Sequence, residues 1–324
     1  MDPVEYDQDP IVEQLKGLFH HIRRRIYDSK SLPLIMSSFL NDLHSRLGGN
    51  KRFDKSQQQD ADEGYNWMVD TILCGALNKA KSQLMNETSL RNDSTINDNA
   101  KTVLNTKKNL NWVDDMFSFL EGKIMSCQEC QNTHYIFEAL SKLFLLRKNG
   151  NVLDSLQKTF LNDEEFVDVD CVTCGKKTTF KQQYCLWSSP DVLYIQLKCF
   201  EENEIPVELD LDLDLDKVKV FEIKKDTTKV HFPVELDLDP YIDDTSSYKK
   251  SQLHKYDLCS VCYHHGVSGN QGHYTSWCRD NNGIFYVFND SAPVRESREN
   301  ESYDNNDAYI LFYRRKNVYE GRNT

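Results

Sequence analysis

Two pairs of cysteines constrain the fold of this chain more than any other feature of its sequence. Cys127 and Cys130 form one C-x-x-C unit, Cys171 and Cys174 form a second, and forty residues separate Cys130 from Cys171. A C-x-x-C turn directs two thiolates at one centre, so two such turns supply the four ligands of a tetrahedral Zn²⁺ site. The spacing therefore predicts structural zinc, with free thiols in two exposed turns as the alternative.

The same pattern limits what the zinc can do. With four sulfur ligands the site is closed to substrate, so we expect a structural ion that clips together the ends of a β arm containing residues 131 to 170. Cys259 and Cys262 repeat the spacing inside an alternating apolar run. Residues three apart in a strand point to opposite faces, so this second pair is not expected to bind metal.

Composition excludes several classes of function. The 324 residues include ten cysteines, begin without a secretory pattern and contain no apolar run long enough to span a bilayer. Such cysteines indicate thiols or metal ligands, which favours a cytoplasmic or nuclear protein with no membrane partner. The net charge of −12 argues against a nucleic-acid partner, because phosphate binding needs a positive face.

Helical patterns fill the first quarter of the chain and strand patterns dominate from residue 117. Apolar residues recur at helical spacing in 9–26, 32–47 and 57–79. Residues 80–111 are rich in Asn, Ser and Thr without a steady period, which predicts a mobile, disordered insertion. The clearest strand-like runs are 194–197, 217–223, 256–263 and 308–313. Helices first and strands afterwards predict an α+β fold.

One segment alternates leucine and acid without interruption. As a strand, residues 208–216 would carry leucines on one face and acids on the other, and residues 233–239 echo the pattern. The favoured interpretation is an amphipathic edge strand with a charged outer face. The alternative is an acidic strip for a basic ligand.

A second chemical pattern lies near the end of the chain. His273 opens a strand-like run, and sixteen residues later come Asn289 and Asp290. The turn signal at 280–283 predicts a hairpin, in which loops of three, four or two residues place His273 opposite Asn289, Asp290 or Ala292. An acceptor beside one ring nitrogen fixes the tautomer and leaves the other nitrogen as a base. The alternative is a purely structural histidine.

Motifs along the whole chain, in order, resemble those of the ubiquitin-specific proteases, a family of cysteine deubiquitinases. Residues 58–63 resemble the family's Gln-Gln-Asp-Ala helix, 119–127 the entry to its zinc-bearing fingers and 193–200 its core strand. The later matches are 232–233, 256–264, 272–274, 288–290 and 308–313. The resemblance runs from about residue 10 to residue 315.

The resemblance implies a papain-like fold with a helical thumb, a β palm and zinc-ribbon β fingers that grip ubiquitin. It implies His273 as general base, Asn289 as its orienting partner and Asp290 as a supporting acid. Gln58 and Asp60 would lie near the ubiquitin tail. Ubiquitin or ubiquitinated proteins are the implied partners. The expected divisions of one domain over 1–324 are a helical part 9–79, the insertion 80–111, fingers and palm 117–200, palm with the histidine 201–315, and a tail 316–324.

The family's nucleophile is not supplied by these residues. It lies in a Gly-Asn-Thr-Cys box before the first matched helix, whereas this chain has no such box and no cysteine before Cys74. Cys74 falls late in a predicted helix, far from the N-terminus that lowers a thiol pKa. We therefore expect a pseudo-deubiquitinase that binds ubiquitin and its tail without hydrolysing isopeptide bonds.

Two other interpretations are open from the sequence. In the first, the residues are the later part of an active deubiquitinase whose cysteine box lies upstream of Met1. In the second, the chain is a zinc-ribbon scaffold unrelated to ubiquitin, in which His273 and Asn289 are structural.

Overall fold

The chain divides into two compact units, Met1–Gly75 and Ala76–Thr324, and each is described by itself. The computed structural model describes residues 60–68, 93–108, 116–205, 220–268, 271–280, 282–290, 292–297 and 304–316. The helices expected at 9–26 and 32–47 lie outside these residues, as do Gln58 and Cys74. Within the described part of the chain, no helix has the length and apolarity needed to cross a membrane.

The described part of the first unit is helix α3, Ala61–Met68. Asp60 begins it as an N-cap, because its Oδ1 accepts the backbone N–H groups of Asp62 at 2.8 Å and of Glu63 at 3.1 Å. These bonds satisfy two of the donors that a helix leaves unpaired at its start. A helix is thus present in the middle of the segment 57–79 where the apolar spacing indicated one.

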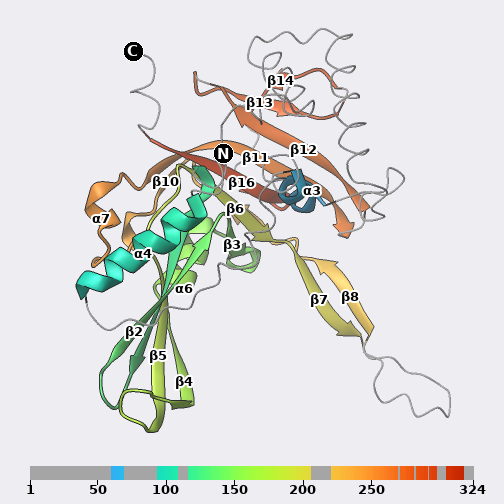
Figure 1. Ribbon diagram of the computed structural model, residues 1–324. Coiled ribbons are helices and arrows are strands. Elements are labelled where there is room, and N and C mark those ends of the chain that lie inside the picture. The colour runs from blue at the N-terminus through green and yellow to red at the C-terminus, as the bar shows by residue number, and fades with distance from the viewer. Residues whose placement is uncertain are drawn as a thin grey trace, which may run out of the picture. The chain divides into compact units, whose positions relative to one another are not determined.

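A four-stranded antiparallel sheet, here called the finger sheet, dominates one part of the second unit (Figure 1). Its strands are β1 (Phe119–Cys127), β2 (Thr133–Leu140), β4 (Asp163–Asp170) and β5 (Lys177–Leu186). The order is β2-β1-β5-β4, so two hairpins, β1–β2 and β4–β5, are joined through the β1–β5 pair. Each hairpin turn carries one of the C-x-x-C units.

The segment between the two C-x-x-C units is not one continuous arm, which corrects the expectation for residues 131 to 170. After β2 the chain leaves the finger sheet through β3, η5 and α6, and β3 pairs in parallel with β6 of a second sheet. The bounds are β3 Leu143–Leu146, η5 Arg147–Asn149, α6 Val152–Phe160 and β6 Val192–Lys198. The two cysteine turns therefore lie on separate hairpins. In the chain, the segment that contains β3, η5 and α6 connects these hairpins.

An eight-stranded sheet, here called the palm sheet, carries the histidine hairpin. Its order is β14-β13-β12-β11-β16-β6-β3, with β10 paired to β11. The further bounds are β10 Glu235–Asp237, β11 Lys255–Ser268, β12 Gln271–Arg279, β13 Phe285–Phe288, β14 Arg295–Glu296 and β16 Ala308–Arg315. The strands predicted at 194–197, 256–263 and 308–313 are confirmed as β6, β11 and β16. Their centres are buried, because this sheet forms the core of the unit.

Smaller elements flank the palm sheet. They are the pair β7 (Phe200–Ile205) and β8 (Val220–Lys225), the pair β9 (Val230–His231) and β15 (Asp304–Asn305), the 3₁₀ turn η6 (Asp239–Tyr241) and helix α7 (Tyr248–Ser251). The leucine–acid alternation at 208–216 lies outside the described residues. Its echo forms β10, where Leu236 and Leu238 are buried while Glu235 and Asp237 are exposed. The amphipathic interpretation is therefore confirmed for the echo.

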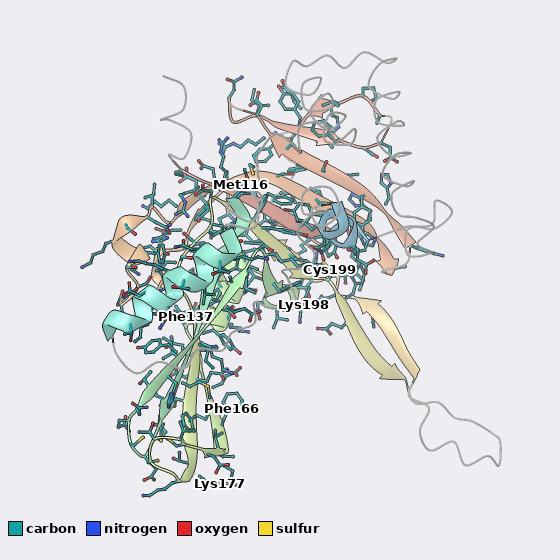
Figure 2. All side chains as sticks on the ribbon, viewed as in Figure 1. Met116, Phe137, Phe166, Lys177, Lys198 and Cys199 are labelled. Atoms are coloured by element: carbon teal, nitrogen blue, oxygen red, sulfur yellow. The ribbon has the colours of Figure 1, made fainter. Side chains whose placement is uncertain are left out.

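Residues 93–108 correct the expectation of a disordered insertion, because they form the four-turn helix α4 (Asp93–Lys108). Ile96, Ala100 and Leu104 recur every four residues, are at most 5% exposed, and pack against a cluster that includes Leu120 and Trp187. Figure 2 shows Phe137 on β2 beside this helix. The apolar stripe is narrow and the rest of the helix is polar. The polar composition therefore favoured a prediction of disorder, although the stripe has helical spacing. Residues 80–92 and 109–111 lie outside the description.

Candidate zinc centre and active site

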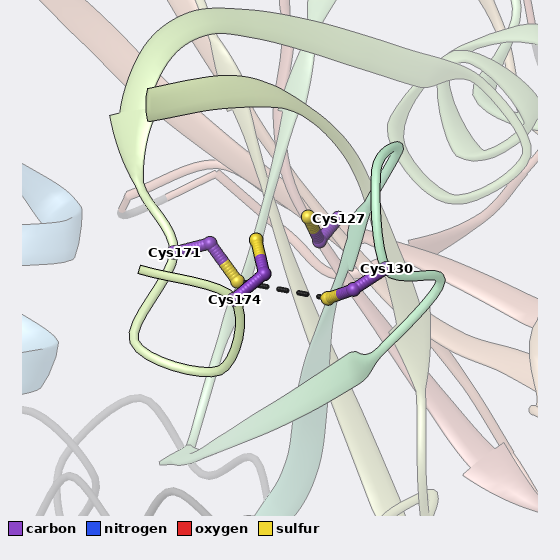
Figure 3. A group of neighbouring side chains, drawn as sticks. All are labelled: Cys127, Cys130, Cys171 and Cys174. Atoms are coloured by element: carbon purple, nitrogen blue, oxygen red, sulfur yellow. Dashed lines mark hydrogen bonds between the residues drawn. The ribbon is translucent and has the colours of Figure 1, made fainter. Parts of the chain in front are cut away.

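The four cysteines predicted to bind zinc meet at the tip of the finger sheet (Figure 3). Their sulfur atoms all lie within 4.8 Å of one another, and the Sγ atoms of Cys130 and Cys171 are 3.8 Å apart. A tetrahedral ion with Zn–S bonds of about 2.3 Å places its sulfurs about 3.8 Å apart. The donor set and its spacing therefore fit a closed zinc site, with Cys127 and Cys174 as the other two ligands.

The two metal-binding turns have the same backbone construction. In each, the residue after the second cysteine donates its N–H to the carbonyl of the first, at 2.9 Å for Gln131 to Cys127 and 2.8 Å for Gly175 to Cys171. Both donors have positive φ, 57° for Gln131 and 67° for Gly175. The backbone N–H groups of Cys174 and Thr173 act to lower the pKa of Cys171, whereas the pKa values of Cys130 and Cys174 in the same cluster are raised.

Cys259 and Cys262 do not add a second cage. Among the described residues, the four finger cysteines are the group of His, Cys, Asp and Glu side chains close enough to share an ion. Cys259 instead donates to the carbonyl of Phe312 at 3.1 Å, and burial raises its pKa to about 11. That this pair binds no metal stays a prediction from the strand pattern.

The palm sheet brings His273 and Asn289 together at the end of the β12–β13 hairpin. Strand pairing runs from Ser276 opposite Phe288 to Arg279 opposite Phe285, so residues 280–284 form the turn. This turn is longer than any of the three loops considered from the sequence. Extending the register by one step sets Asn289 opposite Thr275, which makes His273 its diagonal neighbour on the same face.

The contact between the two side chains fixes the state of the imidazole. His273 Nε2 lies 2.7 Å from Asn289 Oδ1. An amide oxygen only accepts hydrogen bonds, so Nε2 carries the proton and Nδ1 keeps a lone pair. Asp290 Oδ2 is 3.7 Å from Nδ1, beyond hydrogen-bonding distance, and its side chain is 76% exposed. The amide of Asn289 therefore orients the imidazole, and the Asp290 carboxylate lies farther away.

Two glycines allow the backbone approach that places His273. A Cβ at Gly272 would lie 2.3 Å from His264 Nε2, and a Cβ at Gly266 would lie 2.5 Å from the carbonyl oxygen of Gln271. Neither distance is tolerable for a side-chain carbon, so β11 and β12 can cross this closely only with glycine at both positions. This close approach of β11 and β12 lies immediately before His273 and so fixes the backbone position from which its side chain extends.

A second histidine beside the first was missed from the sequence. His265 pairs directly with His273 across β11 and β12, and their rings stack with centroids 6.3 Å apart. His265 Nδ1 lies 2.9 Å from Asp307 Oδ2, and Lys225 Nζ lies 2.8 Å from Asp307 Oδ1. Partial burial acts to raise the pKa of Asp307, but the bonds from Lys225 and His265 outweigh it and lower that pKa. The cross-strand partner could have been found only with the loop length between the strands known.

The residues expected near the ubiquitin tail are not placed against this site. Gln58 lies outside the described residues. Asp60 is in the other compact unit, where its carboxylate caps α3. Their assignment to tail binding therefore remains what the resemblance implies.

None of the described cysteines is among the side chains in contact with His273. Burial raises the pKa values of Cys185, Cys199 and Cys278, as it does for Cys259, so these thiols are held in their neutral form. Within the described residues, the side chains in contact with His273 are Asn289, Asp290 and His265. Within the described residues, His273 and Asn289 thus lie together with no cysteine in contact with the imidazole.

A histidine base oriented by an amide, on a palm sheet joined to a cysteine-tipped finger sheet, defines the class as a thiol-hydrolase fold. The family model of ubiquitin carboxyl-terminal hydrolases matches residues 2–313. The chain belongs to this family, in its ubiquitin-specific-protease type. Membership contradicts a fold outside this family, which the zinc-ribbon interpretation assumed.

Several curated relatives carry the same family name. Ubiquitin carboxyl-terminal hydrolase 20 of Arabidopsis thaliana is 27% identical over 269 residues, which are 82% of this chain and 32% of that protein. The probable ubiquitin carboxyl-terminal hydrolase 16 of Schizosaccharomyces pombe is 27% identical over 203 residues, 62% of this chain and 39% of that protein. The chain therefore spans between 32% and 39% of the length of these two relatives.

Solved structures show the same fold. One is the SAGA Ubp8/Sgf11/Sus1/Sgf73 DUB module bound to ubiquitin aldehyde, with a TM-score of 0.64 and 22% identity over 86% of this chain and 54% of that chain. A second structure of a Ubp8/Sgf11/Sus1/Sgf73 module has a TM-score of 0.64 and 21% sequence identity, over 94% of this chain and 57% of that chain. The expected ubiquitin-specific-protease fold is confirmed.

Proposed function

We propose that these 324 residues bind ubiquitin, with its C-terminal tail at the His273 hairpin, and do not by themselves hydrolyse isopeptide bonds. The observation that carries the proposal is the 2.7 Å contact between His273 Nε2 and Asn289 Oδ1 in a chain of this family. It supports a site kept in the geometry of a base, although none of the described cysteines contacts that base.

Charge supports a ligand with a basic tail. The chain has a net charge of −12, and the side chains of Asp290 and Asp307 lie within the histidine site. A ubiquitin tail carries arginines, which acidic surroundings attract during encounter. Asp307 is already paired with Lys225, so Asp290, at 76% exposure, is the carboxylate accessible to such a ligand.

The finger cysteines complete the proposal with structural zinc. Cys127, Cys130, Cys171 and Cys174 would hold the ion and thereby fix the tips of both finger hairpins. The finger sheet would then present a rigid surface to the globular part of ubiquitin. The ion has no part in proton transfer, because all four of its positions are filled by sulfur.

The lack of turnover follows from the chemistry of thiol hydrolases. A base at Nδ1 of His273 can accept a proton only from a nucleophile that is placed beside it. Removing the nucleophile of such an enzyme leaves only slow residual catalysis from positioning and electrostatics. Ubiquitin conjugates would therefore bind and be released intact.

The test is a titration of the 324-residue chain with fluorescent ubiquitin, compared with ubiquitin lacking its last two residues. We expect a micromolar Kd for intact ubiquitin, weaker binding of the shortened form, and no hydrolysis of a ubiquitin C-terminal amide. Equal affinity for both forms would contradict binding of the tail at the His273 hairpin. No saturable binding of either form would contradict ubiquitin as the ligand.

The second candidate function is that of an active deubiquitinase in which an upstream segment supplies the cysteine. The intact His273–Asn289 contact favours it, since an orienting amide has no use in a site that never accepts a proton. Labelling the endogenous protein with a ubiquitin probe that carries a C-terminal electrophile decides between the two. Capture on a cysteine upstream of Met1 establishes the enzyme, whereas no capture on a protein with the mass of these 324 residues establishes the binding protein.

A further inference from the structure

One face of β11 and β12 carries a row of rings that runs from the buried palm to His273. Trp277 and Tyr263, 8% and 1% exposed, meet edge-to-face with centroids 5.3 Å apart. Tyr263 stacks on His265 at 6.2 Å, and His265 stacks on His273 at 6.3 Å with 25° between the planes. Cross-strand pairs and residues two apart share a face, so the row follows from the strand register. His265 is the link between the core and the base.

His265 is held at both ring nitrogens. Its Nδ1 lies 2.9 Å from Asp307 Oδ2 and its Nε2 lies 2.8 Å from Thr275 Oγ1. A carboxylate only accepts, so Nδ1 carries the proton and donates it to Asp307. Nε2 then accepts from the Thr275 hydroxyl. The ring can neither flip nor change tautomer without losing both bonds.

Lys225 pairs with the carboxylate that holds His265. Its side chain is 1% exposed and its ammonium donates to Asp307 Oδ1 and to the backbone carbonyl of His264. A buried ammonium needs a counter-charge, which Asp307 provides. The ring beside His273 is therefore held by a carboxylate that a buried ammonium itself fixes in place.

His273 needs such a neighbour. Its side chain is 45% exposed, and within the described residues its one hydrogen bond joins Nε2 to Asn289. The second side-chain torsion of histidine is broad and roughly two-fold, so a ring flip exchanges the positions of its two nitrogens at little intrinsic cost. A fixed ring stacked on one face restricts this rotation.

We propose that His265 is a positioning residue for His273, and that the Lys225–Asp307–His265 chain holds the base in the orientation with Nε2 on Asn289 and Nδ1 toward the ligand. The assignment of His273 as the base rests on the function proposed above. The positioning itself is a property of the free protein and is testable without ubiquitin.

The experiment is nitrogen-15 NMR of the imidazole rings in the full 324-residue chain, reading the tautomer of His273 and the exchange of its Nε2 proton with water. For His265→Ala we expect a mixture of tautomers and exchange faster by about fivefold, the size of effect that loss of one stacked ring pair produces. For His265→Phe, which keeps a stacked ring, we expect the single tautomer of the parent. A single Nε2–H tautomer with unchanged exchange in His265→Ala would overturn the proposal.

Matched variants separate positioning from folding. Thr275→Val removes one of the two bonds that hold His265 and should shift His273 part of the way toward its behaviour in His265→Ala, while Asn289→Ala gives the reference for a base without its acceptor. If backbone amide spectra show that His265→Ala disturbs the sheet, the His273 tautomer in His265→Gln is compared with that in His265→Phe to test the stacking. Glutamine keeps a donor for Asp307 without a ring, so a parent-like His273 in His265→Gln would also contradict stacking.

The outcome is independent of the proposed function. If the chain fails to bind ubiquitin but His265→Ala loses the single His273 tautomer, the positioning role is supported and the proposed function is wrong. If the chain binds ubiquitin and His265→Ala leaves His273 unaltered, the proposed function is supported and the positioning role is wrong.

Discussion

The tip of the finger sheet and the end of the histidine hairpin are organised in opposite ways. At the finger tip, four sulfurs within 4.8 Å of one another would fill all the positions of a tetrahedral ion. At the hairpin, a ring that is 45% exposed makes one short bond, at Nε2, and its Nδ1 is left for a group that the described residues do not supply. The first site is complete as a structural element, and the second is half of a chemical one.

The difference teaches which features each kind of site requires. The metal centre depends on two local turns whose backbones repeat each other, so short sequence patterns define it. The histidine site depends on strand order and register, because its members come from β8, β11, β12, and the segments that follow β13 and precede β16. A complete centre tolerates no loss of a ligand, whereas a half site should tolerate changes that leave the ring in place.

Loss of one zinc ligand is expected to have the largest effect. Cys174→Ser should release the ion and unfold the finger tips, because structural zinc contributes about 10–16 kcal/mol to folding in zinc-finger peptides near neutral pH. Zinc content by atomic emission and thermal melting by circular dichroism measure the two consequences. Cys262→Ser is the matched control and should keep both zinc and melting temperature. Normal melting with retained zinc in Cys174→Ser would contradict the closed cage.

Removal of a buried side chain from α4 should rank second. Leu104 is 3% exposed against the cluster around Trp187, so Leu104→Ala should lower the free energy of unfolding by about 2–5 kcal/mol in urea titrations. The exposed Thr102→Ala is the control, with an expected change of about 0.5 kcal/mol or less. Equal stability of the two variants would show that residues 93–108 do not pack on the finger sheet.

The finger sheet should also lose stability as the pH rises toward neutrality. Burial raises the pKa of Glu121 from 4.5 to about 7, and Glu138, directly across β2, adds to the rise. The folded state therefore holds a proton that the unfolded state gives up, and stability falls between pH 4.5 and about 7.

Glu121→Gln removes this dependence. After allowance for partial exposure, we expect the variant to be more stable than the parent at pH 8 by about 1–2 kcal/mol and equal to it near pH 4. Denaturation curves at the two pH values measure the difference. A pH-independent difference between variant and parent would exclude titration of Glu121 as the cause.

The smallest effect is expected at Asp290. Its Oδ2 is 3.7 Å from His273 and its side chain is 76% exposed, so Asp290→Asn should leave the His273 tautomer unchanged and ubiquitin affinity within about twofold. Asparagine also accepts the positive φ of 44° found at this position. Asn289→Ala should abolish the single tautomer. The opposite ranking would make Asp290 the orienting residue.

The features that could be predicted from the sequence depend on local patterns. The cysteine pairs, the strand runs and the order of motifs are periodic or fixed in spacing, and they identified the four-cysteine cluster, β6, β11, β16 and the family. Proximity of His273 to Asn289 followed from the hairpin alone, because every loop length considered set the two near each other. The actual register needed the five-residue turn 280–284, which no turn signal specified.

The features that could not be predicted depend on distant segments. Lys225 and Asp307 are 82 residues apart, and only the palm sheet brings both to His265. Helix α4 was hidden because its buried stripe is three residues at a spacing of four within a polar segment. In both cases tertiary packing, rather than local composition, decides the structure.

The most direct test of the central claim is the intact mass of the 324-residue chain after incubation with a ubiquitin probe carrying a C-terminal electrophile, beside a binding titration under the same conditions. We predict saturable ubiquitin binding and no covalent adduct, because none of the described cysteines contacts His273. A stoichiometric adduct mapped to any of the ten cysteines would contradict it.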